Sequence, residues 1–234
     1  MKRKIITTND GSKTIHIEDW NEQYHSVHGA IQEANHVFIK HGLLFYFENY
    51  CHSEQSEESK LNQVAILEIG FGTGLNAFLT LIESEKLKAT ISYTGVEAFP
   101  VSESELNQLN YTSLLPVDYT EQFKIMHSEP WETNTQITKE FRLKKEKKYF
   151  KDIRSENEFN IIYFDAFGAR VQPELWTEAI FKIMFKALKP QGVLVTYSAK
   201  GSVRRAMQTV GFTVERLPGP PGKREMLRAV KSLN

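Results

Sequence analysis

Three glycines, Gly70, Gly72 and Gly74, alternate with other residues directly after a short apolar run. Glycine allows the backbone to turn sharply and to approach a ligand without interference from a Cβ atom. Where a helix begins after such a turn, its free N–H groups point toward the ligand. The spacing therefore predicts a binding turn for a small polar ligand, although a tight turn with nothing bound would use the same residues.

Two carboxylates beside this turn narrow the choice of ligand. Glu68 precedes the first glycine by two residues, and its charge would oppose a pyrophosphate but favour a ligand that carries an ammonium and a sulfonium. Glu97 follows the next predicted strand, where a carboxylate accepts hydrogen bonds from ribose hydroxyls. With the G-x-G-x-G spacing, these acids favour S-adenosyl-L-methionine over NAD, the nearest alternative. The predicted cofactor contacts are Glu68, Gly70, Gly72, Gly74, Asn76 and Glu97.

A third carboxylate, Asp165, ends another apolar run and is the candidate catalytic residue. Methyl transfer to an amine is an in-line displacement that needs an aligned nitrogen lone pair, which a protonated amine lacks. A strand-end carboxylate beside the sulfonium is placed to orient the amine and to accept its proton. The alternative role is structural, with Asp165 capping the following loop.

The elements that must position these residues alternate between strands and helices. Residues 64–69 form a continuous apolar run, as expected of a strand buried on both faces, and residues 75–87 have helical spacing. Residues 111–150 show no clear pattern. Further strands are predicted at 91–96, 160–165, 192–197, 212–217 and 225–230, and further helices at 102–109, 173–188 and 202–210. The alternation predicts an α/β fold with a doubly wound, mostly parallel sheet, which binds ligands beyond the carboxyl ends of its strands. Together with the cofactor inferred from the glycine turn and its acids, the expected fold is of the class I S-adenosylmethionine-dependent methyltransferase type.

Residues 1–63 are predicted to form an N-terminal extension and linker packed on a Rossmann-like core of residues 64–234, in one domain overall. Within the extension, residues 49–63 are polar and indicate a loop. The candidates to close over the cofactor, or alternatively to pack on the sheet, are Tyr24, Gln32 and Glu33. The spacing His25-x-x-His28 suits a metal pair, but no cysteine pair accompanies it, so no metal is predicted.

Composition places the chain among globular proteins, with 41% hydrophobic and 25% charged residues. Its one cysteine, Cys51, excludes an internal disulfide and disfavours redox chemistry. No apolar run approaches the ~20 residues of a membrane span, and the first residues lack the apolar core of a signal peptide. A cytoplasmic location without membrane contact is therefore expected.

Charge is unevenly distributed along the chain, although the formal net charge is +0. Residues 196–234 carry eight basic side chains against Glu215 and Glu225. Such an end can bind a polyanion, although a solvated surface has the same composition. Arginine pairs with phosphate through two hydrogen bonds, and the loop Gly219-Pro-Pro-Gly222 would present the residues after it outward. The candidates for phosphate contact are Arg204, Arg205, Lys223 and Arg224.

Several motifs occur together over most of the chain. They are Tyr24-His-Ser26, Leu67-Glu-Ile-Gly-Phe-Gly-Thr-Gly-Leu-Asn76, Glu97-Ala-Phe-Pro100, Phe164-Asp-Ala-Phe167, Pro173-Glu-Leu-Trp176, Ser202-Val-Arg-Arg205 and Gly222-Lys-Arg-Glu-Met-Leu227. In this combination the chain resembles the MnmC-type family of tRNA wobble-uridine methyltransferases, in a stand-alone, MnmD-like form without the fused FAD-dependent oxidase. Two positions depart from the family pattern. Gly168-Ala169-Arg170 stands where the family usually has Ala or Ser and then Pro, and only Asp152 is a candidate for the acid that contacts adenine.

The resemblance implies methyl transfer from S-adenosylmethionine to the primary amine of 5-aminomethyl-(2-thio)uridine at the wobble position of tRNA. It also implies tRNA binding through the basic C-terminal region, and functional coupling to a separate enzyme that supplies the aminomethyl group. Phe167 and Trp176 are candidates to stack on the uracil, or they belong to the core. The alternatives are a small-molecule methyltransferase or an aminopropyl transferase on the same fold, and a non-catalytic domain that binds cofactor or RNA.

Overall fold

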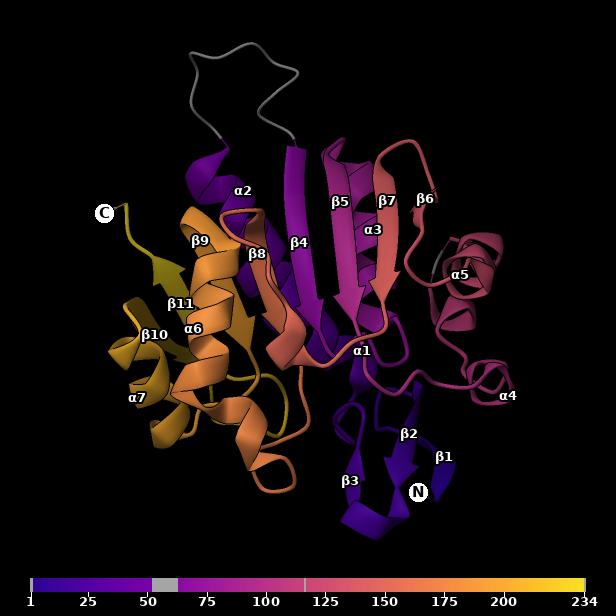
Figure 1. Cartoon of the computed structure of the whole chain (residues 1–234). Helices are drawn as coiled ribbons and strands as arrows, with labels where there is room; N and C mark the ends of the chain where they lie inside the picture. Colours follow the sequence, from indigo (N-terminus) through magenta and orange to yellow (C-terminus); the bar gives the residue numbers. More distant parts are fainter. Residues whose placement is uncertain (1, 52–62, 116, 234) are drawn as a thin grey trace.

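An eight-stranded sheet forms the centre of the molecule, and helices cover both of its faces (Figure 1). The computed structural model describes residues 2–51, 63–115 and 117–233, so most of the loop predicted at 49–63 lies outside the described residues. Across the sheet the strands follow the order β10-β11-β9-β8-β4-β5-β7-β6. Their bounds are β4 Gln63–Ile69, β5 Thr90–Val96, β6 Asn134–Gln136, β7 Phe141–Glu146, β8 Phe159–Phe164, β9 Leu188–Thr196, β10 Phe212–Pro218 and β11 Glu225–Lys231.

Parallel pairing dominates the middle of this sheet. β4 pairs in parallel with β5 and β8, β5 with β7, and β8 with β9, whereas β6, β10 and β11 form antiparallel pairs. After β4 the chain passes through helix α3 (Leu75–Leu87) to β5 on one side, while β8 lies on the other side of β4. This reversal opens a crevice at the carboxyl ends, where doubly wound sheets bind their ligands. The predicted fold class is confirmed.

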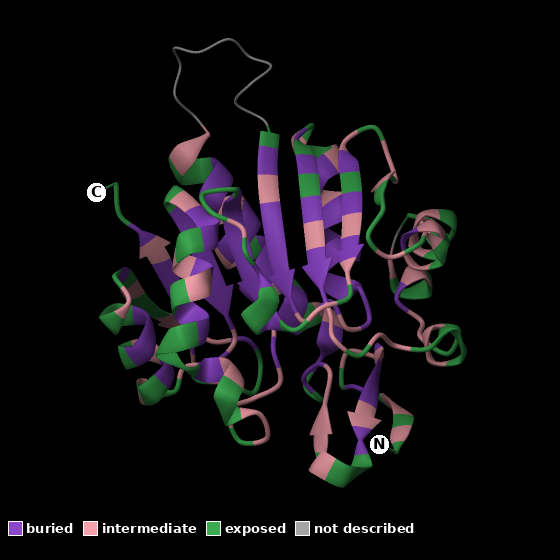
Figure 2. Ribbon diagram, viewed as in Figure 1, coloured by how far each residue is buried: buried purple, intermediate pink, exposed green. Residues whose placement is uncertain are grey.

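Each face of the sheet has its own hydrophobic cluster, because successive side chains of a strand point to opposite sides. In β4, Ile66 belongs to the cluster that includes α3, whereas Leu67 and Ile69 belong to the cluster that includes helix α6 (Glu178–Ala187). β4 and β8 are almost wholly buried, whereas β5 and β7 also carry exposed positions, and Figure 2 shows the helices exposed mainly on their outer sides. The sheet is thus a rigid platform for the loops at its carboxyl edge.

The N-terminal residues form a small antiparallel sheet followed by a helical segment. Strands β1 (Arg3–Thr7), β2 (Lys13–Ile17) and β3 (Glu22–Gln23) lie below the carboxyl ends of the central strands in Figure 1. The short helix η1 covers Glu18–Trp20, and the helical segment consists of α1 Ala30–Ala34, the π-helical η2 Asn35–Leu44 and α2 Phe45–Tyr50. Buried side chains of η2 join the cluster that also contains residues of β8 and β9. The division of the chain at residue 63 stays a prediction.

Residues 111–150, which show no clear sequence pattern, contain regular structure. They hold the short helix η3 (Thr112–Leu114), helix α5 (Thr120–Ser128), β6 and β7. In β7 the buried positions are Phe141, Leu143 and Lys145. A lysine at a buried position hides the apolar alternation by which a strand is recognised.

Two predicted helices have different bounds in the structure. The helix expected at 102–109 is the shorter α4 (Glu103–Leu106), which begins at a capping box formed by Ser102 and Glu105. The helix expected at 173–188 begins as the 3-10 helix η5 (Pro173–Trp176), and α6 starts after Thr177. Two further short elements are η4 Phe150–Asp152 and α7 Gly201–Thr209.

Candidate active site

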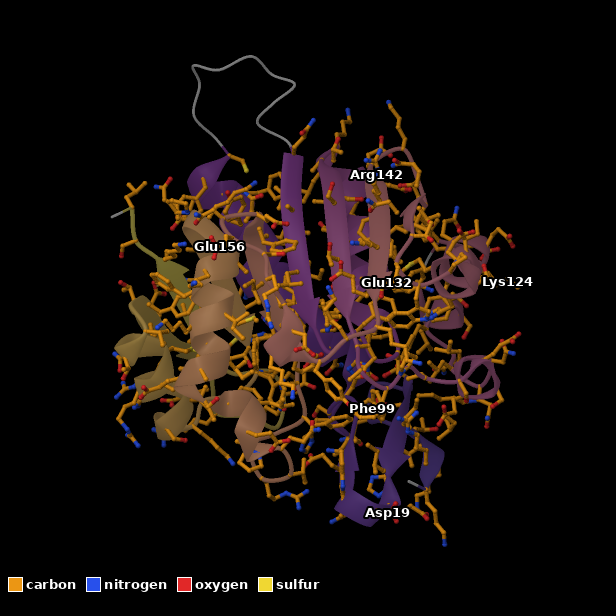
Figure 3. All side chains as sticks on the ribbon, viewed as in Figure 1. Asp19, Phe99, Lys124, Glu132, Arg142 and Glu156 are labelled. Carbon is orange, nitrogen blue, oxygen red and sulfur yellow. The ribbon has the colours of Figure 1, made fainter. Side chains whose placement is uncertain are left out.

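A cavity of about 1430 Å³ lies at the carboxyl ends of β4, β5 and β8, between the central sheet and the small N-terminal sheet. Its walls come from the loops after these three strands and from the N-terminal segment 17–28. Figure 3 labels Phe99, one of the lining residues, in this region. Pockets for one small ligand usually measure about 300–1,000 Å³. The cavity therefore has room for a cofactor together with part of a second molecule.

The glycine turn lies directly against the end of β8. Gly70 has φ of 90°, and a Cβ atom on it would stand 2.6 Å from the carbonyl oxygen of Asp165. Gly70 and Gly72 line the cavity. Gly74 precedes α3, and its missing Cβ leaves space for the ring of His127 rather than for a ligand. Gly70 and Gly72 thus shape the cavity, whereas Gly74 allows the close packing of His127.

The predicted ribose acceptor, Glu97, lines the cavity at the end of β5. Its Oε2 accepts a hydrogen bond from the Gly72 N–H (3.2 Å), and its Oε1 accepts one from the Phe99 N–H (2.9 Å). The carboxylate is therefore held in one orientation by two backbone groups, and its remaining lone pairs are available to a diol. Contact with the ribose stays a prediction.

Glu68 and Asn76 lie behind the wall of the cavity. Both side chains are buried, and neither residue lines the cavity. Asn76 Nδ2 donates to Glu68 Oε1 and to Asp165 Oδ2, both at 2.8 Å. Burial raises the pKa of the Glu68 carboxyl well above its usual range, and the charges of Asp165 and Glu97 act in the same direction. Glu68 therefore does not touch the cavity, and it is linked to Asp165 at the cavity wall by the two hydrogen bonds of Asn76.

Asp165, the predicted catalytic residue, follows β8 and lines the cavity. Its backbone N–H donates to the carbonyl of Ile69 at the end of β4 (2.9 Å), which fixes it beside the glycine turn. Burial raises the pKa of the Asp165 carboxyl to about 7 and the charge of Glu33 adds to this effect, whereas the Asn76 hydrogen bond and the Lys223 charge oppose it. A carboxyl group with this pKa gives up and accepts a proton readily near neutral pH.

Three aromatic side chains form another part of the wall. The ring of Phe167 stands edge-on to the rings of Tyr24 (5.0 Å between centroids) and Trp20 (5.5 Å), and all three residues line the cavity. Trp176 is only 5% exposed, and its Nε1 donates to the Phe167 carbonyl (2.8 Å). Of the two aromatic candidates, Phe167 therefore faces the cavity and Trp176 supports it from the core.

Arg170, at the position where the chain departs from the family pattern, connects this wall to the small sheet. Its guanidinium donates to the carbonyls of Trp20 (3.1 Å) and Asn21 (3.0 Å) and to the Glu22 carboxylate (2.7 Å). The loop that carries Phe167 and the segment that carries Trp20 are thereby held together.

The four basic candidates for phosphate contact differ in exposure. Arg205 and Arg224 are exposed and Arg204 is half-buried, whereas Lys223 lines the cavity in an ion pair with Glu33. The prediction that Lys223 points outward is wrong, because its side chain points into the cavity. Glu33, a candidate cover for the cofactor, is buried and lines the same cavity, whereas Gln32 is exposed.

Two exposed aromatic residues to which the sequence analysis assigned no role lie near Glu97. Phe99 and Tyr149 line the cavity, with ring centroids 6.0 Å apart in an edge-on arrangement. Asp152, the candidate adenine contact, does not line the cavity and lies 3.9 Å from Arg154. A large aromatic residue two positions after a strand-end acid is a signal by which the role of Phe99 could have been found.

The two histidines that were considered as a metal pair, His25 and His28, have different surroundings. His25 is buried, its Nε2 lies 2.8 Å from Thr73 Oγ1, and burial lowers its pKa to about 4. His28 lines the cavity instead and packs against Gly222. Within residues 2–51, 63–115 and 117–233, no group of three His, Cys, Asp or Glu side chains could hold a metal ion. Over the same part of the chain, no helix has both the length and the apolar character to cross a membrane.

Residues 122–232, just under half of the chain, match a family described as S-adenosyl-L-methionine-dependent methyltransferase. A protein from Hydrogenovibrio crunogenus, the tRNA 5-methylaminomethyl-2-thiouridine biosynthesis bifunctional protein MnmC, is 27% identical over 237 aligned positions, which cover 96% of this chain and 33% of that protein. A protein of the same name from Pseudomonas savastanoi is 24% identical, with coverage of 90% and 32%. The chain spans about a third of the length of the curated relatives it matches.

Solved structures give a consistent result. The crystal structure of MNMC2 from Aquifex aeolicus has a TM-score of 0.78 and 26% identity, over 100% of this chain and 70% of that one. Spermidine synthase from Thermotoga maritima has a TM-score of 0.55 and 13% identity, over 99% and 73%, which shows a shared fold alone. The predicted resemblance to the MnmC-type family and the predicted cofactor, S-adenosylmethionine, are confirmed.

Proposed function

We propose that this S-adenosylmethionine-dependent methyltransferase methylates the primary amine of 5-aminomethyl-(2-thio)uridine at the wobble position of a tRNA. The observation that carries the proposal is the Asp165 carboxyl, which lines the cavity beside the glycine turn and has its pKa raised to about 7. A group of this kind suits an acceptor that must lose a proton before it reacts. The choice of tRNA as the substrate depends on the names of the relatives, whose alignments cover most of this chain.

When bound, the cofactor would supply a methyl group on a positively charged sulfur, which would leave as a neutral thioether as the C–S bond breaks and the N–C bond forms. Glu97, held by the N–H groups of Gly72 and Phe99, binds the ribose hydroxyls. Asp165 binds the substrate ammonium and accepts one of its protons, which leaves a lone pair on the nitrogen. Productive transfer needs this nitrogen about 3–3.5 Å from the methyl carbon and in line with the sulfur. Since Asp165 is fixed to the end of β4 by its backbone, it also sets the position of the amine.

The aromatic wall of Phe167, Tyr24 and Trp20 would receive the uracil ring. Single-stranded RNA bases are commonly recognised by stacking on aromatic side chains after they leave their neighbours in the loop. The edge-on packing of Phe167 against the other two rings leaves its position well defined before a base arrives. The RNA backbone would be held by Arg204, Arg205 and Arg224, because guanidinium groups pair with phosphate oxygens. In this proposal Lys223 does not contact the RNA backbone, because it lines the cavity in an ion pair with Glu33.

The proposed substrate implies that this protein acts after another enzyme in the modification of the uridine. An aminomethyl group must already be attached to the uridine before its amine can be methylated, so a separate enzyme has to supply it. A cytoplasmic location belongs to the same proposal, because the substrate is a tRNA.

The proposal is tested by nucleoside mass spectrometry of tRNA from a strain that lacks this protein. We expect loss of methylaminomethyluridine and accumulation of aminomethyluridine. Expression of the wild-type protein should restore the profile, and expression of Asp165→Asn should not. An unchanged nucleoside profile in the deletion strain would contradict the proposed substrate.

A matched experiment with purified components separates the alternatives. Labelled S-adenosylmethionine is incubated with the protein and either tRNA from the deletion strain, tRNA from the wild-type strain or a set of small amines. Label is expected only in the first tRNA. Label in the small amines instead would favour the small-molecule reading, and no transfer at all would favour a binding domain.

A further inference from the structure

An ion pair between Glu33 and Lys223 joins the two ends of the chain across the cavity. Glu33 belongs to α1, and Lys223 belongs to the loop between β10 and β11. Glu33 is 7% exposed, and its Oε2 also accepts a hydrogen bond from the Ser26 N–H (2.8 Å). The Lys223 ammonium lies 3.9 Å from the centre of the Tyr197 ring, so an aromatic face and a carboxylate hold it together. We call this feature the Glu33–Lys223 bridge.

The backbone of the loop directs Lys223 into the cavity. Gly222, the residue before it, has φ of 82°, and a Cβ atom at that position would overlap the ring of His28. The Lys223 N–H donates to the Pro220 carbonyl (2.9 Å), and the Gly219 N–H donates to the Arg224 carbonyl (3.1 Å). Glycine and the turn hydrogen bonds thus let the loop pack against the N-terminal segment, with the lysine side chain pointing inward.

Asp165 stands among charged or titratable groups from several elements. Glu33 from α1 and Lys223 from the β10–β11 loop act on it with opposite signs, and the Asn76 amide from α3 donates to it. Glu68 from β4, Tyr93 from β5 and Tyr197 after β9 also lie within electrostatic range of Asp165. Tyr93 and Tyr197 are protonated at neutral pH, and burial raises their pKa values still further above the usual range. Glu33 and Lys223 are therefore the pair whose charges oppose each other at Asp165.

We propose that the Glu33–Lys223 bridge is a positioning device for methyl transfer, which acts through Asp165 by balancing the charge around its carboxylate. The inference rests on the proposed role of Asp165 as the group that binds the amine and takes its proton. Lys223 favours the ionised carboxylate, which accepts the proton, and Glu33 favours the neutral form. The bridge keeps both partners at fixed positions, so their opposing effects on Asp165 partly offset each other.

The two partners have opposite expected effects on the pH dependence of the reaction. Glu33→Gln removes a negative charge but keeps an oxygen for the Ser26 N–H, so the pKa of Asp165 should fall. Lys223→Met removes the positive charge but keeps an apolar stem on the Tyr197 ring, so the pKa of Asp165 should rise. We expect the rising limb of the rate to move by about one pH unit, downward for Glu33→Gln and upward for Lys223→Met. The double variant should lie between the two single variants.

The experiment measures the Asp165 titration directly as well as the rate. The carboxyl carbons of aspartate are labelled with ¹³C, and the Asp165 signal is assigned by its absence in Asp165→Asn. Its chemical shift is followed against pH for the wild type, both single variants and the double variant without cofactor. Single-turnover methyl transfer to tRNA from the deletion strain is then measured over the same pH range. As a control, Glu225→Gln removes a carboxylate from the more exposed pair with Arg216 on the same hairpin and should move neither curve.

Opposite shifts of the Asp165 signal in the two single variants would support the inference. Unchanged titration of Asp165, or shifts of both variants in one direction, would overturn it, whatever happens to the rate. A purely structural bridge would lower the rate equally at all pH values without moving the limb. If the signal shifts as expected but no methyl reaches any tRNA, the proposed function fails and the charge balance at Asp165 stands.

Discussion

At the scale of single residues, Asn76 connects two acids that have different surroundings. Its amide donates to both Glu68 and Asp165, so each N–H of one group is bound to a carboxyl oxygen. Glu68 is fully buried, and burial raises its pKa well above the usual range, whereas Asp165 borders the cavity with a pKa of about 7. Carboxyl groups with separated pKa values divide the roles of acid and base within one site. We therefore expect Asp165 to exchange its proton with the substrate while Glu68 stays neutral.

Replacement of Asp165 by asparagine should abolish this exchange while leaving the shape of the site intact. We expect Asp165→Asn to lower the single-turnover rate about 10²- to 10⁴-fold at saturating cofactor and tRNA. In the wild type the rate should increase as pH rises through about 7, because only the ionised carboxylate accepts a proton. Cofactor affinity, measured by calorimetry, serves as the control and should change little. Wild-type turnover by the variant would disprove the catalytic role.

The same substitution should increase the stability of the protein at alkaline pH. The pKa of Asp165 is about 7 in the folded protein against the usual 3.8, so the folded state favours the protonated form. Its contribution to stability is present below pH of about 4 and is lost as the pH rises through about 7. We expect Asp165→Asn without cofactor to exceed the wild type by about 1 to 3 kcal/mol at pH 8 and to match it at pH 4. Denaturant unfolding at both pH values measures this, and equal stability at pH 8 would contradict the raised pKa.

At the scale of elements, the turn between β4 and α3 and the end of β8 form one unit. Gly70 contacts the Asp165 backbone so closely that a Cβ atom has no space. The cofactor turn and the proposed base are thus positioned by the same contact. Any change that widens the turn must also move Asp165.

Gly70→Ala tests this coupling. We expect it to weaken cofactor binding and to lower the rate at saturating cofactor, at least about tenfold in each case, because the methyl group pushes β4 and β8 apart. Gly11→Ala is the matched control, since Gly11 has a similar φ of 82° but nothing within 4 Å of the added methyl group. The control should lose only about 1–2 kcal/mol of stability from backbone strain and no catalytic function. Similar kinetics for the two variants would mean that strain, rather than the contact with Asp165, explains the effect.

Much of this arrangement could be predicted from the sequence, because β4 and β8 are mostly apolar runs that end before Gly70 and Asp165, and the predicted strand 91–96 ends before Glu97. β7 could not, since Lys145 occupies one of its buried positions and donates to the His127 carbonyl (3.0 Å). The direction of Lys223 was equally hidden. It depends on the contact between Gly222 and His28, which are far apart in sequence. A local pattern identifies elements and strand ends, but it does not reveal which distant residue fills the space beside them.

At the scale of the whole molecule, the exposed cations Arg205 and Arg224 lie in the C-terminal part that follows β9. Arg205 is on α7, and Arg224 is in the same β10–β11 loop as Lys223. The loop thus presents one basic residue to the cavity and the next to solvent. This arrangement would let a tRNA bind outside while its target base occupies the cavity.

Charge reversal at these two positions should weaken tRNA binding in a salt-dependent way. We expect the double variant Arg205→Glu and Arg224→Glu to reduce the slope of log affinity against log salt concentration by about 2. Lys86→Glu is the control, because Lys86 lies in the last turn of α3, away from the carboxyl ends of the sheet. Filter binding over a range of about 50 to 200 mM salt measures the slope for the wild type, the double variant and the control. An unchanged slope in the double variant would assign these arginines to an ordinary solvated surface.

The position of β11 has a consequence for the order in which the protein is assembled during synthesis. Among the described residues β11 is the last strand along the chain, yet it lies between β9 and β10. A growing chain therefore leaves the ribosome with β10 already made but without the strand that must join it to β9. Such late, non-local pairing is a slow kind of folding event. Because the same hairpin carries Lys223, the cavity wall is completed after Asp165 and the glycine turn are in place, and a nascent chain holds an open site until β11 is inserted.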